Sequence, residues 1–139
     1  MQHIMTDWEQ QIDWAKLRKF RVERMVTVMK QKGIRAVLLA KLDTIRYATS
    51  FHSVQTWMFH GNRHIAIVTD EGHVSLLAAS GDVKRVQNTM PWLTDVEPFP
   101  FLMTEGYPVL EKKMKELIAQ DLPITYYDEE HVKIGDDGL

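Results

Sequence analysis

Two apolar runs around a three-residue turn are the feature that most limits what this chain can fold into. His64–Thr69 and His73–Ala78 are rich in β-branched and aliphatic residues, and Asp70–Gly72 lies between them. Short apolar runs that flank a glycine-containing turn are typical of a β-hairpin. We therefore predict a hairpin in the middle of the chain and a sheet on which the other elements pack.

The sequence before the hairpin predicts a helix, a strand and a second short helix. Thr6–Glu9 has the form of a capping box, and apolar residues then recur at helical spacing up to Gly33, a residue type that ends helices. Arg18 interrupts the apolar stripe, so one kinked helix and two short helices both fit. Ala36–Ala40 is a continuous apolar run, which predicts a strand buried on both faces. Asp43–Tyr47 predicts a short helical turn.

The sequence after the hairpin continues the alternation of helices and strands. Ser80–Asp82 can start a helix, which Pro91 ends. Asp95–Glu97 predicts a short edge strand that stops before Pro98. Pro108 suits the first turn of another helix. We therefore expect an α/β fold.

The length and composition limit the class of protein. A chain of 139 residues with 45% hydrophobic and 26% charged residues fits one globular domain. Cysteine is absent, which excludes disulfides, thiolate nucleophiles and iron–sulfur ligation and suits a reducing compartment. The net charge of −2 argues against a general nucleic-acid binder, and no apolar stretch approaches a membrane span. We expect a cytoplasmic protein that binds neither nucleic acid nor membrane.

Two groups of polar residues are weak candidates for chemistry. His60 and His64 are four residues apart, which is a metal-ligand spacing only on one helix, but loop residues separate them. Histidines at the surface or at the edge of the hairpin are therefore the favoured interpretation. An acidic group near the C-terminus favours a solvated tail over paired-carboxylate catalysis. Its members are Asp128, Glu129, Glu130, Asp136 and Asp137.

Residues 16–35 are strongly basic, with eight Lys and Arg residues against Glu23 alone. Such a helix can cover phosphate groups. However, the charges are spread around the helix, and no aromatic stacking platform accompanies them in the sequence. We favour a solvated face whose long side chains lie over the core.

The aromatic segment Trp57–Phe59 is the most informative local cluster. It lies in a stretch predicted to be irregular, Ser50–Asn62, between Arg46 and Arg63. Large apolar side chains must pack inward or against a partner. Core packing is one interpretation; the other is an interface that supplies an arginine to a ligand carboxylate. No Ser–His–Asp order, phosphate-binding glycine loop or dinucleotide fingerprint is present.

Several segments in order resemble one protein family. They are Arg21–Met25, Gly33–Leu39, Asp43–Ser50, the hairpin at 64–78 and Lys133–Asp136. This series resembles the N-terminal domain of the creatinase/prolidase/aminopeptidase P group, the pita-bread metallohydrolases, over about residues 17–137. Thr44 stands where the family often has Asn, and Ser50 where it often has Gly.

The resemblance implies a mixed β-sheet flanked by helices, in a ribonuclease-H-like layout, over residues 17–139, with 1–16 as a helical extension. Family members hold two divalent metals on Asp, His and Glu ligands in a separate C-terminal domain. None of those motifs can be placed in this chain, so we expect no catalytic residue, metal ligand or cofactor here, and no activity of the chain alone. The C-terminal segment, which also includes a predicted strand at Ile124–Tyr127, is expected to continue into a longer protein.

The implied function is non-catalytic. In relatives, the N-terminal domain supports dimerisation and overhangs the active site of the neighbouring subunit. The candidate overhang residues are Arg46, Tyr47, Trp57, His60 and Arg63. The implied parent is a metal-dependent, Xaa-Pro peptidase-like hydrolase, whose partners are its own catalytic domain and a second subunit.

Three alternatives stay open. One is a free-standing domain that binds a partner protein or a small ligand. Another is the N-terminal domain of a dimethylsulfoniopropionate-lyase-like member, which the run Ile45–Thr49 and the series Trp57, His60 and Arg63 also resemble. The third is a nucleic-acid-associated module that uses the basic helix.

Overall fold

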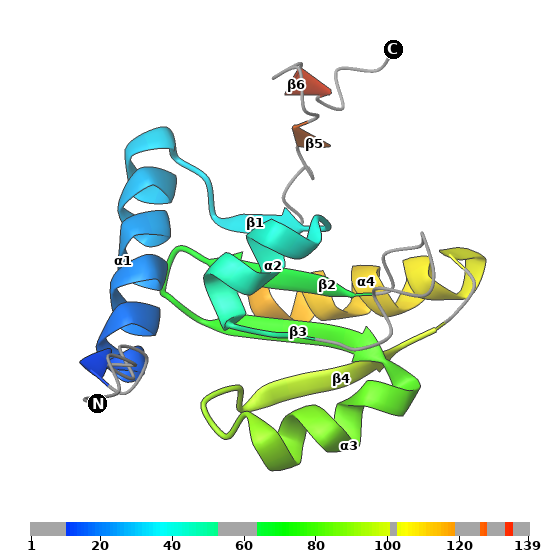
Figure 1. Cartoon of the computed structure of the whole chain (residues 1–139). Helices are drawn as coiled ribbons and strands as arrows, with labels where there is room; N and C mark the ends of the chain where they lie inside the picture. The colour runs from blue at the N-terminus through cyan, green and yellow to red at the C-terminus, as the bar shows by residue number, and fades with distance from the viewer. Residues whose placement is uncertain (1–10, 53–63, 101–102, 119–125, 128–132, 135–139) are drawn as a thin grey trace.

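A computed structural model describes the chain at residues 11–52, 64–100, 103–118, 126–127 and 133–134. It shows an α/β fold in which helices cover both faces of a four-stranded mixed sheet (Figure 1). This confirms the predicted fold class. None of the described helices is both long and apolar enough to span a bilayer.

The sheet has the strand order β1-β2-β3-β4. The four strands are β1 (Ala36–Leu39), β2 (Ile65–Thr69), β3 (Val74–Ala79) and β4 (Asp95–Phe99). The first three run antiparallel to their neighbours, and β4 runs parallel to β3. The β2–β3 pair is the predicted hairpin, and its turn contains Gly72 at a φ of 87°, a backbone angle that favours glycine. A separate antiparallel pair joins β5 (Tyr126–Tyr127) to β6 (Lys133–Ile134).

Three of the described helices cover one face of the sheet, and a fourth covers the other. They are α1 (Trp14–Lys32), α2 (Leu42–Thr49), α3 (Ser80–Thr89) and α4 (Met103–Ile118). Ala66 and Val68 of β2 point into the core under α1, α2 and α3, whereas Ile65 and Ile67 belong to the core under α4. Alternate side chains of a strand face opposite sides of a sheet, so the run Ile65–Val68 of β2 is apolar on both faces.

The first helix has the predicted end and a different beginning. Its N-terminal cap is Asp13, whose carboxylate accepts a hydrogen bond from the Lys16 backbone at 2.9 Å. It ends at Gly33, in the left-handed conformation with a φ of 69°. One helix runs through Arg18, so a break between two helices at that residue is wrong. The capping box at Thr6–Glu9 lies outside the described residues.

Two predictions about strands are wrong. β1 was expected to be buried on both faces, yet only Leu39 is fully buried. The reason is that β1 lies at an edge of the sheet, where cover is incomplete. Likewise, β4 does not stop before Pro98 but continues to Phe99. β4 is also an edge strand, and an edge tolerates proline because one side of the strand has no hydrogen-bonding partner.

The fourth helix begins five residues before Pro108, so the prediction of its first turn is also wrong. Gly106, near the start of this helix, packs closely against β4. A Cβ atom there would lie 2.6 Å from the ring of Phe99 on β4. Leu110 and Met114 then continue the apolar face of α4 into the core.

Ion pairs join α4 to the edge strand β4. The buried Lys113 Nζ donates hydrogen bonds to Asp95 at 2.7 Å and to Glu97 at 2.5 Å. The other Asp95 carboxylate oxygen lies 2.7 Å from Nε2 of His73. Burial raises the pKa of Asp95, but the hydrogen bonds of Lys113 and His73 outweigh it, so the pKa lies below its usual value. Burial also lowers the pKa of Lys113, and its two carboxylate partners reverse that effect and raise it.

Candidate functional site

The second helix places two of the predicted site residues on the protein surface. Ile45, Ala48 and Thr49 are the buried face of α2, which leaves Arg46 and Tyr47 on its outer face. Tyr47 as a whole residue is 37% exposed. The structure therefore makes both residues available to a ligand or partner.

The chain turns sharply into the core where α2 ends. Ser50 adopts the left-handed conformation, with a φ of 57°. The Thr49 hydroxyl donates to the Ile45 carbonyl at 2.6 Å and accepts from the Phe51 backbone at 2.9 Å. These bonds direct the Phe51 ring into the interior, where it is fully buried.

Five residues next to this turn form a polar and aromatic group, which we call the anchor cluster: Phe51, His52, His64, Asp82 and Arg85. The Asp82 carboxylate lies 3.1 Å from His64 Nε2 and accepts from Arg85 Nε at 2.9 Å. Arg85 also donates to the His52 carbonyl at 2.8 Å. The Phe51 and His64 ring centroids are 4.6 Å apart.

The anchor cluster joins two parts of the chain that are adjacent in space and separated in sequence. His52 is the last described residue before positions 53–63, and His64 is the first described residue after them. Two residues of α3 contact these two histidines: Arg85 contacts His52, and Asp82 contacts His64. The cluster thus fixes the points at which the chain leaves and re-enters the described fold.

Three predicted site residues, Trp57, His60 and Arg63, fall at positions 53–63 and lie outside the described residues. Their proposed roles stay predictions. His64 was expected at the surface or at a hairpin edge, and this is wrong because its side chain is only 3% exposed. Its burial follows from its position directly before β2, beneath Phe51 and α3.

Asp82 and Arg85 are not among the predicted site residues, and the sequence indicates Asp82 only as part of a helix start. One signal was available: the two residues have opposite charges and are three apart on a helix, so their side chains can meet. Nothing in the sequence indicated that His64 would join them, because it is 18 residues from Asp82.

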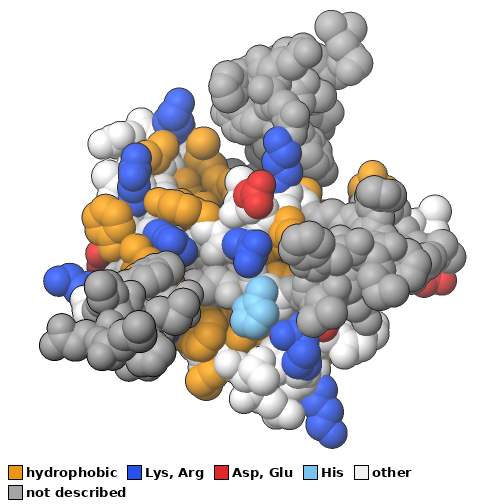
Figure 2. Space-filling model, viewed as in Figure 1, with side chains coloured by type: hydrophobic (Ala, Val, Ile, Leu, Met, Phe, Trp, Pro, Cys, Tyr) orange, Lys and Arg blue, Asp and Glu red, His pale blue; other side chains and the backbone are white. Residues whose placement is uncertain are grey.

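Aromatic side chains from elsewhere in the chain lie beneath two arginines of the basic helix. Arg18 lies over the Trp92 ring at 4.1 Å from its centroid, and Arg21 lies over the Tyr47 ring at 5.4 Å. Trp92 in turn donates a hydrogen bond to the Thr49 carbonyl at 2.8 Å. Figure 2 shows Lys and Arg side chains beside hydrophobic ones over α1. The basic helix is therefore a largely solvated face in which two arginines pack on rings.

The described residues offer no ligand set for the metal pair that the resemblance implied. Among them, no group of three or more His, Asp or Glu side chains is arranged to hold a metal ion.

The family model of the creatinase/prolidase N-terminal domain matches residues 21–130 of this chain. The chain belongs to this family. The match includes α2, the hairpin and the whole anchor cluster. No protein of curated function matches the chain.

Solved structures of similar fold include Xaa-Pro peptidases. An Xaa-Pro dipeptidase from Bacillus anthracis is 15% identical with a TM-score of 0.55, and the match covers 72% of this chain and 24% of that one. An Xaa-Pro aminopeptidase from Streptococcus pyogenes is 17% identical with a TM-score of 0.53, covering 72% and 70%. Another from Streptococcus thermophilus is 18% identical with a TM-score of 0.50, covering 70% and 68%. The chain thus spans about a quarter of the Bacillus protein, and these likenesses concern the fold.

Proposed function

We propose that this chain is the non-catalytic N-terminal domain of an Xaa-Pro peptidase-like metallohydrolase. Family membership supports this proposal, together with the much greater length of the similar Bacillus dipeptidase. In the proposed protein, a separate catalytic domain holds a divalent metal pair that activates water. The domain acts in the cytoplasm, for which the absence of cysteine is suitable.

The proposed role of the domain is to cover the substrate site of a neighbouring subunit in a homodimer. The observation that carries this role is the anchor cluster, which ties both ends of the segment 53–63 to α3. That segment contains Trp57, His60 and Arg63, and it follows α2 in the sequence. A segment fixed at both ends can present an aromatic ring and a guanidinium to a substrate at a small entropic cost.

The first test is the intact mass of the native product in its source cell. A product far heavier than the 16.2 kDa of this chain supports the proposal. A native product of 16.2 kDa contradicts it and leaves a free-standing binding domain.

The second test uses the whole enzyme, assayed on Xaa-Pro dipeptides. We expect Arg63→Ala and Trp57→Ala to raise KM with a smaller effect on kcat, because the residues bind substrate and take no part in the chemistry. Lys30→Ala, an exposed position near the end of α1, is the control. Unchanged kinetics in both test variants would refute the covering role, and light scattering of the enzyme tests the dimer separately.

A further inference from the structure

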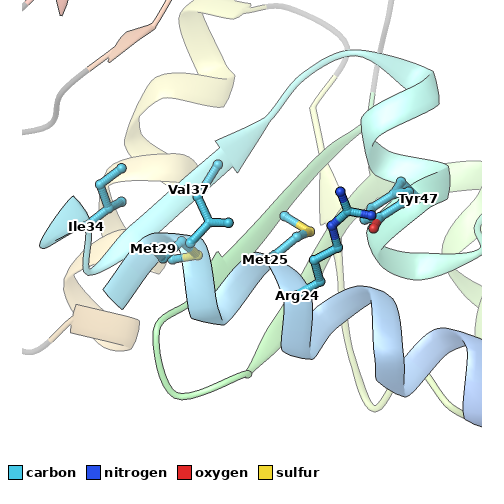
Figure 3. A pocket seen from close by; sticks show the side chains of 7 residues that line it. Arg24, Met25, Met29, Ile34, Val37 and Tyr47 are labelled. Atoms are coloured by element: carbon cyan, nitrogen blue, oxygen red, sulfur yellow. The ribbon is translucent and has the colours of Figure 1, made fainter. Parts of the chain in front are cut away.

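A groove runs along the C-terminal half of α1, with a cavity of about 450 Å³. Its walls come from α1, from Ile34 in the connection between α1 and β1, from Val37 on β1 and from Tyr47 on α2 (Figure 3). We call it the α1 groove. It is lined by Arg24, Met25, Val28, Met29, Ile34, Val37 and Tyr47.

The floor of the α1 groove is apolar. Met29 is buried, Met25, Ile34 and Val37 are half-buried, and Val28 remains 43% exposed. Methionine side chains are flexible and polarizable, so they adapt to the shape of an apolar ligand. This floor therefore fits an aliphatic group.

The polar groups of the α1 groove lie together at one end. Figure 3 shows Arg24 and Tyr47 at the end opposite Ile34. Arg24 is exposed, and no described carboxylate forms an ion pair with it. The acidic side chain next to it, Glu23, lies 3.8 Å from Lys19. This end of the groove therefore carries an uncompensated positive charge, which favours an anionic ligand group.

We propose that the α1 groove binds a medium-chain aliphatic carboxylate. The chain lies on Met25, Met29 and Val37, and the carboxylate pairs with the planar guanidinium of Arg24 beside the Tyr47 hydroxyl. The cavity volume is that of a small-molecule site. From Arg24 to Met29, the last residue of α1 that lines the groove, the helix rises about 7.5 Å, and Ile34 continues the apolar floor beyond it, which suits a medium-length chain such as decanoate. This binding is independent of the proposed function.

The test is a titration of the whole chain with decanoate below its micelle concentration, followed by NMR of ¹³C-labelled methionine methyl groups. We expect shifts confined to Met25 and Met29 among the eight methionines. Octanoate should bind about tenfold more weakly, because it buries two methylene groups fewer. Decylamine, which carries the opposite charge on the same chain, should bind at least several-fold more weakly. Equal binding of the two decyl compounds, or shifts spread over all methionines, would overturn the proposal.

Two substitutions at exposed positions of α1 separate the groove from its surroundings. Val28→Glu places a carboxylate in the groove and should weaken decanoate binding about tenfold or more. Gln31→Glu adds the same charge at another exposed residue of α1, seven positions from Arg24 and outside the groove lining, and should bind decanoate within about twofold of the native chain. Circular dichroism checks that both variants fold. Equal affinities of these two variants would refute the site.

Discussion

Lys113 of α4 and Asp95 of β4 form an ion pair, with 2.7 Å between Nζ and Oδ1, on the face of the sheet opposite α1. The Lys113 side chain is buried, and Asp95 is also bonded to His73. The pair joins the helix to an edge strand whose outer side has no partner among the described strands. The ion pair therefore attaches α4 to the edge of the described sheet.

Replacing Lys113 with Met should lower the free energy of unfolding by about 2 kcal/mol, because two carboxylates lose their buried donor. Urea denaturation measures the change. The matched control is Lys112→Met, whose side chain is 78% exposed and should cost less than about 0.5 kcal/mol. Equal effects of the two substitutions would contradict a structural role of the ion pair.

Stability should fall in acid because of Asp95. Its pKa in the folded protein lies below the ordinary value of 3.8, so the unfolded chain takes up the proton first as the pH falls. The contribution of Asp95 is therefore complete above that value and is lost as the pH drops through the folded pKa. We expect the unfolding free energy of Asp95→Asn to depend less on pH below about 4 than that of the native chain. Asp43→Asn, at an exposed position of α2, should keep the native pH dependence.

Arg85→Met should destabilise the fold by about 2 kcal/mol, because it removes the donor to the His52 carbonyl and the cation beside Asp82. Thermal and urea unfolding measure the change. Lys84→Met alters the neighbouring exposed position of the same helix and should have little effect. A native-like stability of Arg85→Met would show that the anchor cluster does not hold the chain at these points.

Gly106→Ala should destabilise the protein by about 1–3 kcal/mol, although alanine is the better helix former. The reason is the Phe99 ring, which occupies the space that a Cβ atom requires. Combining it with Phe99→Leu should cost less than the sum of the two single substitutions, which a double-mutant cycle measures. Additive costs would contradict the direct contact.

Local features of the sequence determined most of the elements. The turn at Asp70–Gly72 predicted the hairpin, and Gly33 predicted the end of α1. Both signals depend on backbone angles that few residue types adopt, so they can be recognised in the sequence without knowledge of the fold. The family resemblance rests on the order of such segments, and the family model that matches residues 21–130 confirms it. The exposure of Arg46 and Tyr47 is likewise a consequence of helical spacing on α2.

Only the tertiary structure decided which surfaces are covered and which distant side chains meet. The sequence of an apolar strand such as β1 does not show whether the strand lies at the centre or at the edge of a sheet. β1 is largely half-buried because it is an edge strand of the described sheet. His64 and Asp82 are 18 residues apart, as are Lys113 and Asp95. Hydrophobic periodicity reports the direction of a side chain along one element. Contacts between elements depend on how those elements pack, which is a property of the whole fold.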